Sequence, residues 1–263
     1  MRHPEASARQ IGVPETSVSL SGLIRPGSPT AGRRGGEQAP RGGRQVSRGG
    51  RRGSRVASRT PAAASEPELP PGQYIPAAWP VLHYGPVPAF HPDTWDLRVL
   101  GATESGSEHR WSWDELAHLP RCEVVADFHC VTKFTVRGIA WEGIAAAELL
   151  RAAPPDPAVT HVMVWADFGY SANLAIADFA ADDTLFATHR DGEELTPEHG
   201  YPLRLVVPSR YAWKSVKWVR AVEYLTKDRR GFWEERGYHN TADPWREQRY
   251  SYQERPGEGP PLV

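Results

Sequence analysis

The sequence predicts a mixed, β-rich α+β fold in a single domain. Five segments have the apolar pattern of strands, at residues 95–100, 122–130, 159–166, 201–207 and 216–224. Only two short segments have the pattern of helices, at residues 112–119 and 144–152. A doubly wound parallel sheet needs a regular alternation of strands and helices. Because the predicted helices are few and unevenly placed, an α+β arrangement is favoured.

The first 60 residues have a composition that cannot supply a hydrophobic core. They contain twelve Arg, no Lys and three acids among many Gly, Ser and Pro. About 190 residues remain, which is within the usual size of one domain. We therefore predict a disordered tail at residues 1–68, a folded domain at 69–255 and a flexible C-terminus at 256–263.

The basic tail hides the charge of the folded part. The whole chain has 31 Lys and Arg and 32 Asp and Glu. Without the twelve Arg and three acids of the tail, 19 basic and 29 acidic residues remain. The tail also lacks the interleaved aromatics that stack on bases, so we expect no nucleic-acid partner. No apolar stretch of the length of an export signal follows Arg33-Arg34 or Arg51-Arg52, and no segment could span a membrane. We therefore expect a cytoplasmic protein.

The elements of the domain follow from local patterns along the chain. Residues 69–86 contain too many Pro for a helix or a central strand and should form an extended surface strap. Ser112, with Glu115 three positions later, forms a capping box at the start of the first helix. Ala and Leu dominate the second helix. Residues 230–250 interleave Trp, Tyr and Arg, and we expect them to pack on the domain as a clamp rather than to form a partner surface.

Cys130 is the first candidate for chemistry. It ends the strand at 122–130, near Lys133 and Arg137, and neighbouring cations lower the pKa of a thiol. Thiolates are preferred ligands of soft metals. The alternative is that Cys130 is a small buried hydrophobe. Cys122 lies too far along the same strand to form a disulfide with Cys130.

A second candidate site follows the strand that contains Arg204. The apolar run from this residue ends at Pro208, and the next turn carries Lys214, Ser215 and Lys217. Cations, a hydroxyl and backbone N–H groups are the donors that hold a phosphate monoester. The alternative is a solvated basic turn, because no Gly-rich phosphate loop is present.

Together, the Cys130 segment and the Arg-Leu-Val-Val-Pro run at 204–208 resemble the sulfite oxidase-like molybdopterin-dependent oxidoreductases. The resemblance covers residues 69–250 and implies a sulfite oxidase-type molybdopterin-binding fold. It implies a Mo-molybdopterin cofactor in which the pterin supplies two sulfurs to molybdenum and the thiolate of Cys130 supplies a third. It further implies that phosphate and pterin are held by Leu82, His83, His199, Arg204, Ser215, Val216 and Lys217.

The resemblance also implies a reaction, two-electron oxygen-atom transfer on a small-molecule substrate. The expected substrate is a small sulfur oxyanion or a sulfoxide, and the direction is open. The residues after Cys130 differ from the Ala-Gly-Asn-Arg type of animal sulfite oxidases, so Lys133 or Arg137 is expected to steer the substrate. No haem-binding domain is recognised in the sequence. We therefore expect a separate electron-transfer partner, a haem protein or another redox protein.

The sequence disfavours two other classes of function. A non-catalytic molybdopterin-fold scaffold would have no chemical use for a thiol at the metal position, so Cys130 argues against it. A zinc enzyme is disfavoured because His129 and Cys130 are adjacent and lack the paired ligand spacing of tetrahedral sites.

Overall fold

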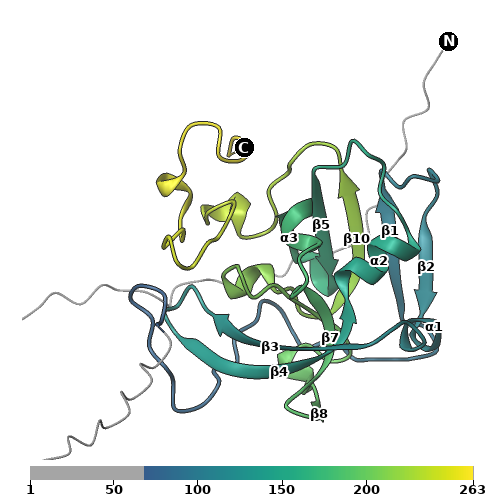
Figure 1. The fold of residues 1–263 in the computed structure, drawn as a ribbon, viewed down its shortest axis with the longest axis horizontal. Coiled ribbons are helices and arrows are strands. Elements are labelled where there is room, and N and C mark those ends of the chain that lie inside the picture. Colours follow the sequence, from purple (N-terminus) through teal and green to yellow (C-terminus); the bar gives the residue numbers. More distant parts are fainter. Residues whose placement is uncertain (1–67, 263) are drawn as a thin grey trace, which may run out of the picture. The chain divides into compact units, whose positions relative to one another are not determined.

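The computed structural model describes residues 68–262, which form two β-sheets with few and short helices (Figure 1). The predicted α+β, β-rich fold is confirmed. Apart from Glu68, the tail predicted at residues 1–68 lies outside this part of the chain. No helix within residues 68–262 is long and apolar enough to cross a membrane.

The first sheet has the strand order β2-β1-β10-β5-β6. Strands β1 and β10 are parallel, and the other neighbours are antiparallel. In Figure 1 the labelled strands β1, β2, β5 and β10 stand upright. Their bounds are β1 Asp96–Gly101, β2 His109–Ser112, β5 His161–Ala166, β6 Ser171–Ala175 and β10 Val219–Leu225.

The second sheet has the order β3-β4-β7-β8, with β9 paired to β7, and all its pairs are antiparallel. The long β3 and β4 run across the direction of the first sheet (Figure 1). Their turn and the end of β9 carry most of the predicted site. The bounds are β3 Cys122–His129, β4 Thr135–Ala145, β7 Leu185–Arg190, β8 Glu193–Glu194 and β9 Arg204–Val206.

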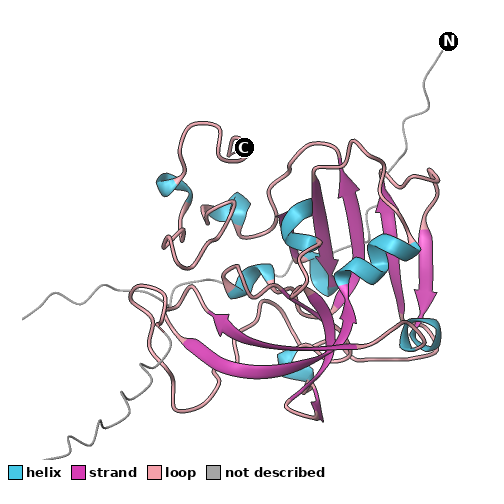
Figure 2. Ribbon diagram, in the orientation of Figure 1, coloured by secondary structure: helices cyan, strands magenta, loops and turns pink. Residues whose placement is uncertain are grey.

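Much of the remaining chain is loop (Figure 2). The capping box is confirmed, because the Ser112 hydroxyl accepts from the N–H of Glu115 and the carboxylate of Glu115 accepts from the N–H of Ser112. The α-helices are α1 Trp113–Ala117, α2 Ala146–Ala152 and α3 Ile176–Phe179. The 3-10 helices are Asp167–Gly169, Pro197–His199, Ala212–Lys214, Glu234–Arg236 and Ser251–Gln253.

Two apolar clusters hold the sheets in place. The larger one joins the first sheet, through residues such as Leu97 and Val222, to Leu149 of α2 and Phe179 of α3. The smaller one lies on the second sheet and centres on the fully buried Trp141. Burying one large apolar side chain contributes about 1.5–3 kcal/mol, so these clusters provide a rigid support for the turns between the strands.

All five predicted strands are present, some with shifted ends. The strand predicted at 201–207 is shorter, and the one predicted at 216–224 begins three residues later. The helix predicted at 144–152 begins at Ala146, because Ile144 still belongs to β4. Strands β2, β4, β6, β7 and β8 were not predicted. In β4 the alternation is broken by a bulge at Gly143, where a Cβ atom would lie 2.0 Å from the carbonyl oxygen of Phe186.

The strap and the clamp both behave as predicted. Residues 69–90 form no strand or helix, and Tyr74 makes an isolated bridge to Phe134. Residues 230–250 pack on the domain, where the N–H of Phe232 donates to the carbonyl of Ser171 in β6 at 2.9 Å. The guanidinium of Arg249 donates to the carbonyl of Val131. The clamp therefore reaches the turn that carries Cys130.

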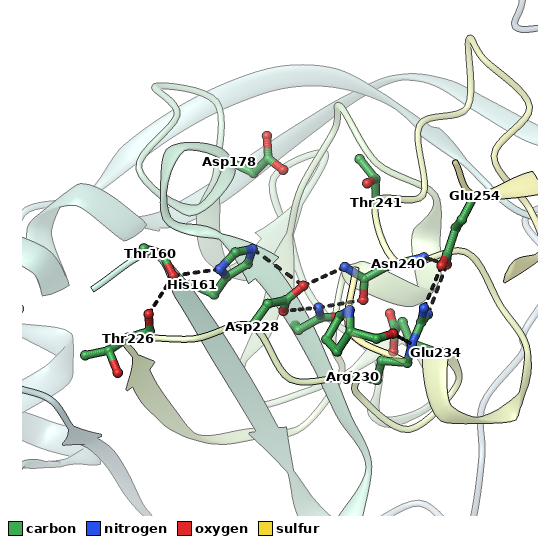
Figure 3. A network of polar contacts seen from close by, with 12 residues as sticks. Thr160, His161, Asp178, Thr226, Asp228, Arg230, Glu234, Asn240, Thr241 and Glu254 are labelled. Carbon is green, nitrogen blue, oxygen red and sulfur yellow. Dashed lines mark hydrogen bonds and ion pairs between the residues drawn. The ribbon is translucent and has the colours of Figure 1, made fainter. Parts of the chain in front are cut away.

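A set of polar side chains, which we call the clamp network, fastens the clamp to β5 and β6 (Figure 3). Asp228 accepts from the amides of Asn173 and Asn240, each at 2.7 Å. Glu254 pairs with Arg230, whose Nε also donates to the carbonyl of Pro260. The bond from Arg230 to Pro260 attaches part of the segment 256–263 to the clamp. The flexibility expected for this segment stays a prediction. The clamp network comprises His161, Asn173, Lys214, Asp228, Arg230, Glu234, Asn240 and Glu254.

Candidate cofactor site

Cys130 occupies a tight turn between β3 and β4. Its N–H donates to the carbonyl of Phe134 at 2.8 Å, and the N–H of Lys133 donates back to its carbonyl at 3.0 Å. Lys133 has a positive φ of 78°, which closes the turn. The thiol is 7% exposed and lies 3.1 Å from the hydroxyl of Thr132. The turn therefore holds a buried sulfur in a fixed direction. Cys122 and Cys130 are both free, as expected.

The electrostatic surroundings of Cys130 differ from the expectation. Burial is the largest influence and raises the pKa of the thiol, whereas we expected cations to lower it. The cation that does lower this pKa is Arg249 of the clamp, and Lys133 is exposed on the surface of the turn. The sequence prediction missed Arg249 because 119 positions separate it from Cys130 and only the folded clamp brings them together.

Four basic side chains gather at the other end of the site, and we call Arg190, His199, Arg204 and Lys217 the cation cluster. Arg204 is fully buried and donates to the carbonyls of His199 at 2.9 Å and Ser215 at 3.3 Å. A backbone bridge pairs Arg204 with Lys217. The predicted phosphate-binding residues from 199 to 217 are thus brought together by β9 and the turn that follows it.

Gly200 permits this close arrangement. It ends the 3-10 helix Pro197–His199 with a φ of 113°, and a Cβ atom there would lie 2.9 Å from the Cβ of Arg204. The Nδ1 atom of His199 bonds the hydroxyl of Thr196 at 3.0 Å. The other ring nitrogen of this histidine is therefore directed into the site.

The members of the cation cluster suppress one another's charge. Burial, followed by Lys217 and the two arginines, lowers the pKa of His199 to about 4. Burial and then Arg190 lower the pKa of Arg204 to about 9. Burial and then Arg204 lower the pKa of Lys217 to about 7. No member of the cluster forms an ion pair with a carboxylate of residues 68–262.

These residues fit the phosphate of a pterin cofactor. The cluster offers positive charge, and the buried His199 Nε2 and Arg204 Nε have no hydrogen-bond partner in the described chain. Buried donors without partners are costly unless a ligand accepts from them. The thiolate of Cys130 raises the pKa of Lys217, so thiol and cluster lie within electrostatic range of each other. A soft metal at one end and a phosphate at the other suit this donor set.

The remaining predicted residues have different surroundings. The carbonyl of Leu82 accepts from Lys217 at 2.8 Å, which places the strap beside the cluster. His83 is exposed and its ring lies 5.3 Å from that of Trp218. The hydroxyl of Ser215 accepts from Val207 and keeps its proton to donate. The backbone N–H of Val216 donates to Lys214, so its one donor is already used.

Arg137 lies in β4, close to the turn, and is half-buried.

Tyr170 was not predicted as a site residue. Its hydroxyl donates to the carbonyl of Trp213 at 2.6 Å. Burial and the nearby Glu234 carboxylate raise the pKa of its phenol well above the ordinary value, while Arg204 lowers it and Cys130 raises it. The phenol is therefore within electrostatic range of both the thiol and Arg204. It belongs to no recognisable motif, and it precedes a strand that the sequence pattern did not reveal.

Comparison with known proteins places this geometry in a family. Residues 84–233 match the oxidoreductase molybdopterin binding domain. The oxidoreductase YuiH of Bacillus subtilis is 38% identical over 185 residues, which are 70% of this chain and 92% of YuiH. The catalytic subunit MsrP of the protein-methionine-sulfoxide reductase of Gluconobacter oxydans is 28% identical, over 59% of this chain and 56% of MsrP.

More distant similarities agree with this placement. Human mitochondrial sulfite oxidase is 28% identical over 58% of this chain and 33% of its own length. The sulfane dehydrogenase SoxCD from Paracoccus pantotrophus has a similar fold, with a TM-score of 0.50 and 23% identity over 55% of this chain and 41% of that one. The chain thus spans only about half, or less, of these relatives other than YuiH. It belongs to the oxidoreductase molybdopterin binding domain family and is a sulfite oxidase-like oxidoreductase that uses Mo-molybdopterin.

Proposed function

We propose that this protein catalyses two-electron oxygen-atom transfer on a small sulfur oxyanion or a sulfoxide. The observation that carries the proposal is the pairing of one buried thiol, Cys130, with a partly buried cation cluster that forms no ion pair with a carboxylate of residues 68–262. The names of two relatives, a sulfite oxidase and a methionine-sulfoxide reductase subunit, support the substrate class. One name denotes an oxidase and the other a reductase, so together they stand for the two directions of oxygen-atom transfer.

Each side chain of the site has a proposed role that follows from its chemistry. Cys130 is the proposed metal ligand, and the turn that carries it fixes the direction of its sulfur. Arg204, Lys217 and Ser215 are the proposed donors to the cofactor phosphate, because cations and a hydroxyl suit a phosphate monoester. His199 is neutral near pH 7, given its pKa of about 4, and can donate one hydrogen bond through Nε2.

The strap and the turn after β9 complete the proposed pterin contacts. Leu82 and His83 lie where the strap meets Lys217, and Val216 supports the same turn from the core. Val216 therefore contributes shape rather than a backbone donor. The bound cofactor supplies a metal that alternates between the +6 and +4 states and exchanges an oxygen atom.

Substrate steering is assigned to cations near the Cys130 turn. Lys133 is exposed and Arg137 is half-buried, so each is proposed to attract an oxyanion or a sulfoxide dipole as it approaches. Arg249 is almost fully buried and bonded to Val131, so it is proposed to hold the turn rather than to meet the substrate. The hydroxyl of Tyr170 donates its proton to the carbonyl of Trp213, so Tyr170 is proposed to hold the turn after β9 in place rather than to meet the substrate.

Electrons are proposed to pass through a separate partner, a haem protein or another redox protein. We also propose a cytoplasmic location, supported by two cysteines that are both free, since free thiols persist in reducing compartments. Fractionation of the native host, with antibody detection of the chain, tests the location. Recovery with secreted or periplasmic proteins would overturn it.

The first experiment measures molybdenum and released pterin in wild type, Cys130→Ser and Cys122→Ser, each purified from a host that makes the cofactor. Cys122 is the other free thiol and serves as the matched control. We expect near-stoichiometric molybdenum and pterin in wild type and in Cys122→Ser. Cys130→Ser should lose turnover and keep most of the pterin, because the phosphate contacts lie elsewhere. A folded wild type with neither metal nor pterin would overturn the proposal.

The substrate class is tested on the loaded enzyme with an artificial redox dye. Sulfite oxidation and reduction of a small sulfoxide are assayed in wild type, Lys133→Gln and Arg137→Gln. We expect one of the two reactions to dominate, and we expect at least one variant to raise KM more than it lowers kcat, since steering acts on binding. Turnover of neither substrate class would overturn the assignment.

A further inference from the structure

Arg190 is the member of the cation cluster that has no proposed ligand contact so far, and Trp79 lies beside it. Arg190 ends β7 and is half-buried. Within residues 68–262 its guanidinium forms neither an ion pair nor a hydrogen bond, and it lies 4.7 Å from the centre of the Trp79 ring. A half-buried guanidinium normally binds a carboxylate, a carbonyl or a phosphate.

The charge of Arg190 makes the cluster less stable in the absence of an anion. It is the largest of the charges that lower the pKa of Arg204, and it also lowers the pKa of His199. The two guanidinium groups therefore repel each other across a poorly solvated space. Removal of either charge, or addition of an anion, relieves the repulsion.

Trp79 fixes the position of Arg190. The indole lies 4.2 Å from the ring of His199 and 5.7 Å from the guanidinium of Arg204, so it contacts three members of the cluster. Its other neighbours are the buried rings of Phe128 at 5.3 Å and Trp141 at 5.7 Å. These core rings hold the indole in place, so Trp79 is a rigid element in an otherwise irregular strap.

The strap is fastened on both sides of Trp79. The amide of Gln73 donates to the carbonyl of Cys130 at 3.0 Å, and Lys217 donates to the carbonyl of Leu82 at 2.8 Å. Residues 73–82 therefore link the turn of the proposed metal ligand to the cation cluster. Trp79 lies between these two attachments.

We propose that Arg190 is a further binding residue for the terminal phosphate of the cofactor, and that Trp79 is the positioning residue that holds Arg190 at the phosphate. The proposal rests on the proposed function and extends its site from β9 to β7 and the strap. A phosphate monoester carries a charge of about −1.5 to −2 at pH 7. Before the anion binds, Lys217, with its pKa of about 7, is only about half protonated at pH 7, and His199 is neutral. Arg204 and Arg190 therefore supply the two full charges that attract the phosphate before it binds.

The first test uses the full chain, purified without cofactor, and inorganic phosphate as the probe. Thermal unfolding is followed against phosphate concentration for wild type, Arg190→Gln, Arg190→Lys and Arg151→Gln. Arg151 pairs with Glu148 within α2 and is the matched control for loss of a guanidinium. We expect Arg190→Gln to need about tenfold more phosphate for half the stabilisation, as the loss of one charged hydrogen bond implies. Arg190→Lys should need less phosphate than Arg190→Gln, because the positive charge is kept.

The sign of the effect without phosphate separates binding from structure. If Arg190 binds the anion, Arg190→Gln should unfold at the same or a higher temperature than wild type in the absence of phosphate, because a repulsion is removed. A lower unfolding temperature combined with an unchanged phosphate dependence would overturn the proposal, since Arg190 would then only support Trp79.

The second test follows the loss of pterin from loaded protein by gel filtration and pterin fluorescence. We expect release about tenfold faster from Arg190→Gln and from Trp79→Ala than from wild type, with Trp79→Phe close to wild type because it keeps a ring. Equal retention by all variants would overturn the proposal while leaving the proposed function intact. A wild type that never acquires pterin would instead refute the proposed function, so the two failures are distinguishable.

Discussion

The cation cluster and the clamp network are both partly buried polar regions, and they differ in one respect. In the clamp network the cations meet carboxylates, as Lys214 meets Glu234 at 2.5 Å and Arg230 meets Glu254. In the cation cluster Arg204 and Lys217 donate to backbone carbonyls, and no member pairs with a carboxylate in the described part of the chain. Burying charge without a partner is costly. The balanced region therefore serves folding, and the unbalanced region is prepared for an anionic ligand.

The largest effect is expected from breaking the balanced region. Glu234 is fully buried, so Glu234→Gln leaves the ammonium of Lys214 without its counter-charge. Loss of one partner of a buried pair costs about 3–5 kcal/mol. Urea unfolding of the cofactor-free chain should show that loss. The double variant Lys214→Met with Glu234→Leu should recover most of it. If Glu234→Gln lowered the free energy of unfolding by less than about 1 kcal/mol, the ion pair of Lys214 and Glu234 would not be important for folding.

A comparable change in the unbalanced region should spare the fold and weaken ligand binding. Lys217→Gln should change the free energy of unfolding of the cofactor-free chain by less than about 1 kcal/mol, since it removes repulsion as well as two bonds to carbonyls. It should reduce pterin retention about tenfold or more, which corresponds to about 1.4 kcal/mol. Lys227→Gln, at an exposed lysine, is the control. Equal effects on folding in both regions would contradict the comparison.

Proton uptake on anion binding offers a finer measure of the imbalance. The pKa of Lys217 is about 7 in the structure, against an ordinary value of 10.5. An anion beside it raises this pKa, so binding of phosphate near pH 8 should take up a proton, up to about one per site. Calorimetry in two buffers of different ionisation enthalpy gives the number. The uptake should disappear in Lys217→Gln, and release of protons would contradict the assignment.

The pH dependence of stability is a further measure of the imbalance. The pKa of His199 falls from 6.5 to about 4 on folding, so the unfolded chain binds the proton first as the pH decreases. Stability of the cofactor-free chain should therefore fall between about pH 6.5 and pH 4, and His199→Gln should make that part of the profile flatter. Unfolding in urea at several pH values measures the slope. If the unfolding free energy of His199→Gln changed with pH as steeply as that of wild type, the lowered pKa of His199 would be contradicted.

The sequence predicted the parts of the fold that depend on local pattern. The apolar runs of β5, β9 and β10 and the capping box of α1 each depend on neighbouring residues, so they were found. Strand β4 was missed because Gly143, which allows β4 to lie close to β7, interrupts its apolar pattern. Strand β6 was missed because its small residues, Ser171 and Ala172, give little hydrophobic signal.

The site was predicted in part for the same reason. Lys214 and Lys217 stand three positions apart in one basic turn, yet one is neutralised by Glu234 and the other joins the cation cluster. Nothing in their local sequence separates these outcomes, because the partner comes from the distant clamp. Arg190 was missed because it ends β7, a strand that the sequence pattern did not reveal, and Trp79 was missed because it lies in the irregular strap. The resemblance identified the core of the site, whereas the balance of charge required the fold.

The bond from Arg249 to the carbonyl of Val131 has a consequence for biogenesis. It joins residues 118 positions apart, and the clamp that supplies it is synthesised after both sheets. Since a chain forms its contacts as it emerges from the ribosome, the Cys130 turn waits for this bond until translation has passed residue 249. A chain that ends before residue 249 therefore lacks this support of the Cys130 turn.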